Sequence, residues 1–176
     1  TVEHVHAIPT FGKAEALATD TLGNYYLGTR FFSTVDFNPG VGVTQLTNNG
    51  QADNAIVKFD SMGVFKWVKA FTGFQQKQLK DLTVDKFNDV IGIGYFEATV
   101  DFDPSSGVNN QNSVGLTDTY IVKLSDMGAF KWVRTFQGVN SCIGIALSTN
   151  TIGDVISTGY FKFTVDFNPS LANYPL

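Results

Sequence analysis

The chain has 176 residues, of which 16 are acidic and 12 are basic, giving a net charge of −4. This length suits one domain with a sizeable core, and the absence of any block of Lys or Arg disfavours a nucleic-acid partner. No apolar stretch approaches the roughly 18 residues of a membrane-spanning helix. Charged residues make up only 16% of the chain, and Asn, Gln, Thr, Ser and Gly supply the other polar groups. This composition is typical of rigid β-rich proteins found outside the cell.

The first periodic segment is residues 2–8, in which apolar and polar side chains alternate. Alternation predicts a β-strand similar to the last strand of a repeat, with His4 and His6 on one face. Two histidines at this spacing can chelate a metal, but the neighbouring Glu3 points to the opposite face. We therefore interpret the histidines as surface residues of an edge strand, with a metal site as the less favoured alternative.

From residue 30 onward, one eleven-residue pattern occurs three times, at residues 30–40, 95–105 and 160–170. The copies follow each other at an interval of 65 residues. A fixed period is typical of solenoids, propellers and repeat arrays, whose units bury their apolar faces against their neighbours. The sequence therefore predicts one repeat domain over residues 1–176, with copies at approximately 1–71, 72–136 and 137–176.

The middle copy contains four alternating segments rich in β-branched and aromatic residues, at residues 79–84, 90–97, 120–124 and 130–136. They predict four strands, and about eleven strands in the whole chain with no long helix. The turn after the first strand opens with Asp85, and Asp20 and Asn150 open the equivalent turns; such side chains accept hydrogen bonds from turn amides. The fourth residue of the turn is a type that tolerates the left-handed conformation of a tight hairpin: Gly23, Asn88 or Gly153.

The fourth strand of each complete copy carries a tryptophan, Trp67 or Trp132. Strict alternation would place Phe65, Trp67 and Phe71 on the same side of the strand. The tryptophans could serve as sugar-stacking platforms, but their repetition at one position favours packing between repeat units.

Residues at equivalent positions are expected to be buried alike, Phe96 with Phe161 and Ile91 with Ile156. The single cysteine, Cys142, excludes an intrachain disulfide. It opens the apolar run 142–147, which favours a buried core thiol over a nucleophile.

Long loops rich in Asn, Gly and Thr connect the second and third strands, at residues 36–53 and 101–118. Insertions of this kind map to one face of a repeat protein, and that face often binds a partner. The alternative is structural, with Leu46 and Leu116 holding the loops against the strands. Both interpretations can hold together.

Each copy of the repeated pattern contains a polar pair two residues apart: Asp36 and Asn38, Asp101 and Asp103, and Asp166 and Asn168. Oxygen ligands at this spacing start many calcium loops, although the glycine and distal glutamate of an EF-hand are missing. The proline that follows each pair also suits a strand terminator in which the Asp side chains accept hydrogen bonds from loop amides. The structural interpretation is favoured, and calcium is the alternative. No other cofactor is expected, since residues 92–94 lack the third glycine and the helix of a dinucleotide site.

The chain resembles a family of bacterial β-propeller repeats in three features: an Asp-x-x-Gly-Asn turn at residues 20–24, Gly-x-Phe at 94–96 and 159–161, and Val-Asp-Phe-Asn/Asp-Pro at 35–39, 100–104 and 165–169. The resemblance covers nearly the whole chain and implies an all-β fold of four-stranded propeller blades. It also implies a secreted or cell-surface protein, often long and modular.

These observations predict a non-catalytic scaffold or interaction surface, since the acidic positions are shared among the copies and no Gly-x-Ser-x-Gly elbow is present. The expected partners are further blades of the same polypeptide or further copies of the chain, and a protein or a glycan. Two alternatives remain, a homopolymeric extracellular fibre subunit and part of a carbohydrate-binding or carbohydrate-active propeller. Two complete blades cannot close a ring, so we expect either a longer polypeptide or an assembly.

Overall fold

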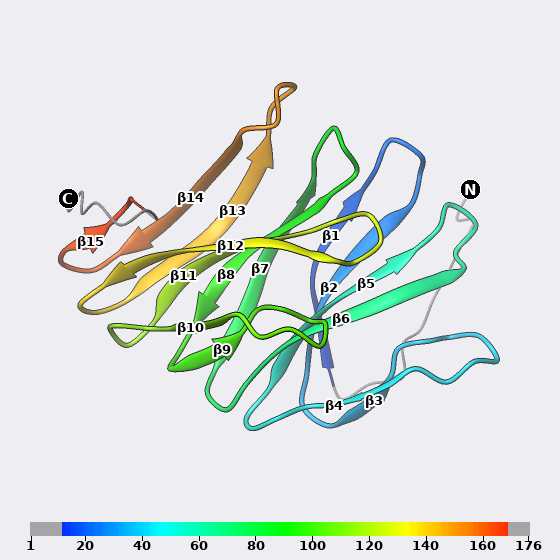
Figure 1. Cartoon of the computed structure of the whole chain (residues 1–176), viewed down its shortest axis with the longest axis horizontal. Coiled ribbons are helices and arrows are strands. Elements are labelled where there is room, and N and C mark those ends of the chain that lie inside the picture. The colour runs from blue at the N-terminus through cyan, green and yellow to red at the C-terminus, as the bar shows by residue number, and fades with distance from the viewer. Residues whose placement is uncertain (1–11, 169–176) are drawn as a thin grey trace.

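The computed structural model describes residues 12–168, and this part of the chain is all-β, with fifteen strands. No helix among these residues is long and apolar enough to cross a membrane. Twisted antiparallel sheets follow each other along the chain and pack face to face (Figure 1). The predicted all-β class with propeller-type four-stranded blades is confirmed.

Ten long strands build two complete four-stranded units and one two-stranded unit. Blade 1 contains β1 (Gly12–Thr19), β2 (Tyr25–Phe31), β5 (Asp53–Phe59) and β6 (Phe65–Gly73), in this order. Blade 2 repeats the same meander with β7 (Lys77–Val84), β8 (Val90–Phe96), β11 (Asp118–Leu124) and β12 (Phe130–Gly138). The third sheet contains β13 (Cys142–Thr149) and β14 (Val155–Phe161).

Five short strands lie in the segments that follow the second strand of each unit: β3 (Thr34–Asp36), β4 (Gln45–Thr47), β9 (Thr99–Asp101), β10 (Asn110–Asn112) and β15 (Val165–Asp166). The prediction of about eleven strands is therefore wrong, even though the strand expected at residues 2–8 lies outside the described residues. Two or three residues are too few for alternation to be recognised, because it takes four or more to distinguish a strand from a loop.

The inserted hairpins connect neighbouring units. Strand β9 of blade 2 pairs with the end of β6 in blade 1, and β15 pairs in the same way with β12. Glycine allows the close approach, because a Cβ at Gly73 would lie 2.6 Å from the Thr99 carbonyl oxygen and one at Gly138 would lie 2.7 Å from Val165 Cγ2. Strands β9 and β15 thus fasten blade 2 and the third unit to the blade that precedes each of them.

The largest buried cluster lies between blades 1 and 2, where Phe71 of β6 meets Phe96 of β8 and Tyr120 of β11. Trp67 packs against this cluster, and Trp132 packs against a second cluster that joins blade 2 to Leu147 of the third sheet. The prediction that the tryptophans pack between repeat units is confirmed.

The prediction that Phe65 shares a face with Trp67 is wrong. Phe65 packs on the opposite side of blade 1, against a cluster that includes Phe59. The cause is a register shift in the pairing of β5 with β6, where Lys58 faces Trp67 and the next residue, Phe59, faces Phe65. A bulge that leaves one residue unopposed reverses the faces of all residues beyond it.

Burial of equivalent positions holds in blade 2 but fails in the third sheet. Phe96 and Ile91 are fully buried, whereas Phe161 is 42% exposed and Ile156 is 59% exposed, so the expectation for the latter pair is wrong. Strand β8 lies between β7 and β11, while β14 pairs only with β13 in the described part of the chain. A second neighbouring strand is needed to cover these side chains.

The turns behave as the sequence predicts. Asp20 Oδ1 accepts hydrogen bonds from the amides of Leu22 and Asn24, both at 2.9 Å, and Asp85 and Asn150 form the equivalent bonds. The fourth turn residues have positive φ angles: +80° at Gly23, +62° at Asn88 and +100° at Gly153. Local turn chemistry therefore fixes these hairpins.

Candidate functional site

The acidic corners cap the loops that follow them. Asp36 Oδ1 accepts hydrogen bonds from the amides of Asn38 at 3.0 Å and Thr44 at 2.9 Å. The equivalent bonds join Asp101 Oδ1 to the amides of Asp103 (3.0 Å) and Asn109 (2.8 Å), and Asp166 Oδ1 to the amide of Asn168 (2.8 Å). The side-chain oxygens of Asn38 and Asp103 accept a further amide each, both at 2.9 Å. The predicted capping of loop amides is confirmed.

Calcium binding at these corners stays a prediction. Within residues 12–168 no three His, Cys, Asp or Glu side chains lie close enough to share a metal ion, so backbone carbonyls and water would have to complete the coordination. The two histidines, His4 and His6, lie outside the described residues.

If the corners bind calcium, millimolar calcium should raise the melting temperature, because a ligand that binds only the folded state stabilises it. The middle corner should respond most, since Asp101 and Asp103 are both anionic, and Asp103→Asn should weaken the response. Differential scanning fluorimetry with and without a chelator measures the effect. An unchanged melting curve would leave amide capping as the role of these residues.

A polar cluster joins blade 1 to the β11–β12 turn of blade 2, and we call it the junction cluster: Tyr26, Lys58, Trp67 and Asp126. The carboxylate of Asp126 forms an ion pair with Lys58 and accepts a hydrogen bond from the Tyr26 hydroxyl at 3.1 Å. Its backbone carbonyl accepts from Trp67 Nε1 at 3.0 Å and from Lys58 Nζ at 3.1 Å. Burial, followed by the nearby Asp20 carboxylate, raises the pKa of Tyr26 well above its usual range. The tyrosine is thus a neutral structural donor.

A second charged cluster lies within blade 2. Lys123 Nζ contacts Asp85 Oδ2 at 2.5 Å and Asp89 Oδ2 at 3.1 Å, and Lys131 Nζ contacts Asp89 Oδ2 at 2.5 Å. Burial acts to raise the pKa of Asp85, but hydrogen bonds from Lys123 and two turn amides outweigh it, so the pKa lies below its usual value. Both carboxylates are 3% exposed and are neutralised by lysines, so they act as structural anions.

Lys123→Met should lower the free energy of unfolding by about 2 to 3 kcal/mol at pH 7, because it leaves the Asp85 carboxylate buried without its cation. The folded pKa of Asp85 is depressed below its ordinary value of 3.8. Its contribution is therefore present above that pH and lost as the pH falls through the folded pKa. The difference between variant and wild type should shrink between pH 5 and pH 2 in urea titrations. A difference independent of pH would show that lost packing, rather than charge, causes the effect.

One ion pair is completely buried at the link from blade 1 to blade 2. Lys77 is 1% exposed and its ammonium lies 2.7 Å from Asp53 Oδ1, while three backbone carbonyls accept its other hydrogen bonds. Asp118 occupies the place of Asp53 in blade 2, where Cys142 replaces the lysine. Burial raises the pKa of Asp118, and two amides at 2.7 and 2.9 Å hydrogen-bond its carboxylate.

Cys142 is buried, as predicted. It is 4% exposed, its sulfur lies 3.3 Å from the Thr119 hydroxyl, and burial raises the pKa of the thiol. A raised pKa disfavours the thiolate that a nucleophile needs.

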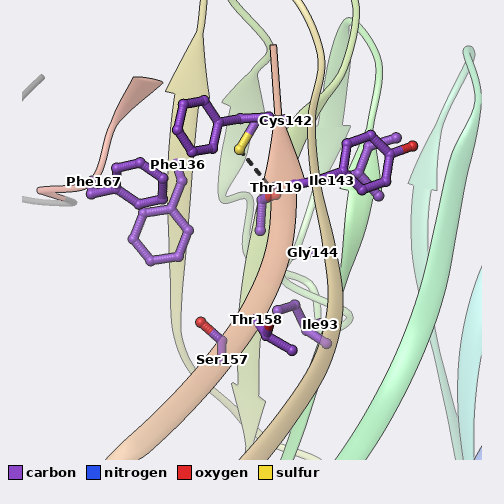
Figure 2. A pocket seen from close by; sticks show the side chains of 12 residues that line it. Ile93, Thr119, Phe136, Cys142, Ile143, Gly144, Ser157, Thr158 and Phe167 are labelled. Carbon is purple, nitrogen blue, oxygen red and sulfur yellow. Dashed lines mark hydrogen bonds between the residues drawn. The ribbon is translucent and has the colours of Figure 1, made fainter. Parts of the chain in front are cut away.

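A cavity of about 170 Å³ lies between blade 2 and the third sheet. Phe136 of β12, Phe161 of β14 and Phe167 line it together with Cys142 and Gly159, and Figure 2 shows Phe136 and Phe167 lying side by side at its wall. No charged side chain lines the cavity. Its chemistry suits an apolar or aromatic group rather than catalysis.

Open grooves lie beside the inserted hairpins, and we call them the hairpin grooves. In blade 1 the groove lies between residues 38–42 and 63–65, with a volume of about 390 Å³. In blade 2 it lies between Asn109 and Gln111 on one side and residues 130–135 of β12 on the other, with a volume of about 490 Å³. The two grooves lie at neighbouring places in the repeat and share the position of Phe65 and Phe130. Pro, Gly, Val and Phe residues make up most of the first lining, whereas amide and charged side chains contribute to the second.

The loop leucines differ from each other. Leu46 packs against the outer cluster of blade 1, so the predicted anchoring role is confirmed there. Leu116 is 67% exposed, so the same prediction is wrong for blade 2. The two are not in equivalent positions of the repeat, and only Leu46 lies on the strand that pairs with Val35.

Sequence reasoning missed the buried Lys77 pair and the cavity. A signal for the first was available, because Lys77 stands where the other copies have Gly12 and Cys142. The cavity had no local signal, since its walls come from five strands, β8 and β11 to β14, together with Phe167.

No family model matches this sequence. The chain is 25% identical over 131 residues to an uncharacterized WD repeat-containing protein of Acanthamoeba polyphaga mimivirus. The similarity covers 69% of this chain but only 9% of that relative's length. It indicates a β-propeller-like repeat and agrees with the four-stranded blades.

Proposed function

We propose that the chain is a non-catalytic, propeller-like repeat scaffold that binds a protein partner through its hairpin grooves. The observation that carries this proposal is that charged side chains form structural ion pairs at the turns of the blades. Lys58 and Lys123 occupy equivalent positions of the repeat. Lys58 neutralises the turn carboxylate of Asp126 at the junction of the two blades, and Lys123 neutralises that of Asp85 within blade 2. An enzyme on such a scaffold would place acids or histidines in one blade only, facing a cavity.

The groove of blade 2 has the chemistry of a protein-binding surface. Asn109 and Gln111 form its hairpin side, joined by a hydrogen bond of 2.7 Å from Gln111 Nε2 to Asn109 Oδ1. Lys131 and Arg134 are exposed on the strand side. Amides and cations around an open groove suit an extended, polar or acidic protein segment.

A photo-crosslinking residue in place of Gln111, introduced into the native polypeptide, tests the groove. We expect a discrete protein adduct from this position and none from Thr151, an exposed residue in the β13–β14 turn. Arg134→Glu should abolish the adduct while the melting temperature changes by less than about 3 °C, since surface charge changes cost little stability. Equal adducts from both positions, or none from Gln111, would contradict the proposal.

A glycan is the second candidate ligand, because Trp132 lines the same groove as the two amides. Amides and an aromatic face are the groups that bind sugars by hydrogen bonding and stacking. A glycan array with wild type and Gln111→Ala separates the candidates. Binding that the substitution abolishes would favour the glycan over the protein partner.

We propose further that the scaffold works on a secreted or surface-exposed bacterial protein. The low share of charged residues and the resemblance to bacterial repeat proteins support this location. Fractionation of source cells with an antibody against the chain tests it. Recovery in the cytosolic fraction alone would contradict it.

A further inference from the structure

The outer edge of β14 and the cavity beside it form one surface, separate from the hairpin grooves. We propose that this surface docks a strand of a further repeat unit of the same kind, whose aromatic side chain fills the cavity. In blade 2 the second strand β8 pairs on both sides, with β7 and with β11. In the described part of the chain the equivalent strand β14 pairs only with β13. Its free edge presents backbone amides and carbonyls to an incoming strand.

Blade 2 shows what fills the cavity. At its junction with blade 1, Tyr120 of the third strand is fully buried between two phenylalanine rings, at centroid distances of 4.7 and 6.3 Å. The same phenylalanine cradle is already formed at the third sheet. The Phe96–Phe102 ring distance of 5.4 Å in blade 2 matches the Phe161–Phe167 distance of 5.2 Å at the third sheet. The Phe71–Phe102 distance of 5.7 Å likewise matches the Phe136–Phe167 distance of 5.9 Å. At the third sheet, the described residues supply no ring in the place that Tyr120 occupies in blade 2.

The residue that faces the incoming side chain is the same in blade 2 and in the third sheet. Tyr120 pairs across the sheet with Gly94, whereas in blade 1 the small Ala55 pairs with Thr29. The third sheet carries Gly159 at this position, and Gly159 lines the cavity. Both glycines are required by the preceding strand, since a Cβ at Gly94 would lie 1.9 Å from the Gln78 carbonyl oxygen and one at Gly159 would lie 2.2 Å from the Ile143 carbonyl oxygen. Since the phenylalanine cradle and the facing glycine match those of blade 2, the docked strand should carry Tyr or Phe, as blade 2 does.

Charge adds a second requirement. Lys58 and Lys123 are the second-to-last residues of the third strands, and Lys123 contacts Asp85 and Asp89 of the β7–β8 turn. Asn150 takes the place of Asp85 in the β13–β14 turn. Asp154 takes the place of Asp89 in that turn and is exposed. The docked segment thus has an aromatic residue two positions after an Asp and a lysine three positions after the aromatic, the pattern of residues 118–124.

A synthetic peptide of residues 116–138, which spans the third and fourth strands, is the probe for this surface. Added to the isotope-labelled chain, it should shift the amide resonances of Gly159 and Phe161 in NMR spectra and raise the melting temperature. Tyr120→Ala in the peptide should weaken binding at least tenfold, whereas Met127→Ala, an exposed turn residue, should change it less than twofold.

Matched substitutions in the chain complete the test. Phe167→Ala removes a wall of the cavity and should weaken peptide binding at least tenfold. Phe163→Ala is the control, because Phe163 is 74% exposed and its counterpart in blade 2 is Ala98. Absence of shifts at β14, shifts elsewhere only, or equal binding of the Tyr120→Ala peptide would overturn the proposal. None of these outcomes depends on the hairpin grooves, so the proposed function is tested independently.

Discussion

Lys77→Met should lower the free energy of unfolding by about 3 to 5 kcal/mol. The substitution keeps an unbranched side chain of similar length but removes the ammonium that lies 2.7 Å from Asp53 Oδ1. Asp53 has no exposed surface, so its carboxylate cannot recover the lost interaction by hydration. The substitution also removes the hydrogen bonds that the ammonium donates to three backbone carbonyls at the link from blade 1 to blade 2. Urea denaturation followed by fluorescence measures the change.

Lys66→Met is the matched control. Lys66 also forms an ion pair, 2.8 Å from Asp60 Oδ2, but its side chain is 47% exposed. Exposed pairs contribute little, so we expect a change within about 0.5 kcal/mol. The double variant Lys77→Met and Asp53→Asn should recover part of the loss, since it removes the uncompensated charge. A Lys77→Met variant as stable as Lys66→Met would contradict a structural role for the buried pair.

Phe96→Ala should destabilise the protein by about 3 to 5 kcal/mol, as truncation of a buried aromatic ring does. Phe96 is fully buried in the cluster between the two blades and packs edge to face on Phe102 at 5.4 Å. Alanine would leave a cavity that the surrounding rigid strands cannot close. Denaturant unfolding of the purified chain gives the value.

The repeat supplies its own control, Phe161→Ala. Phe161 occupies the same position one repeat later, but it is 42% exposed, so its truncation should cost less than about 1.5 kcal/mol. Similar losses for the two variants would mean that the third sheet is covered as completely as blade 2. If the chain were first saturated with the peptide of residues 116–138, the cost of Phe161→Ala should approach that of Phe96→Ala.

The turns were predictable because their chemistry is local. Asp20 and Asn88 lie within a few residues of the amides and φ angles that they satisfy, so residue type alone predicts the hairpin. The order of the long strands followed for the same reason, since short turns join strands that pair side by side. The bulge at Lys66 was not predictable, because the extra residue is fixed by pairing between β5 and β6 rather than by either strand alone.

The candidate sites divide in the same way. The amide-capping role of Asp36 and Asp101 could be inferred from sequence, because donor and acceptor lie at most eight residues apart. The partner of Lys77 could not, since Asp53 lies 24 residues away on another strand. The cavity beside Phe161 depends on blade 2 meeting the third sheet, and alternation carries no information on which neighbour covers a strand.

The sequence by itself determined the all-β class, the 65-residue unit, the four-stranded meander and the turn positions. These follow from periodicity and from interactions between residues close in the chain. Only the tertiary structure decided that the inserted segments form hairpins that pair with the preceding blade, and that identical positions such as Phe96 and Phe161 differ in burial. The physical reason is that burial is a property of the neighbour as much as of the residue, because a side chain leaves water only where another strand covers it.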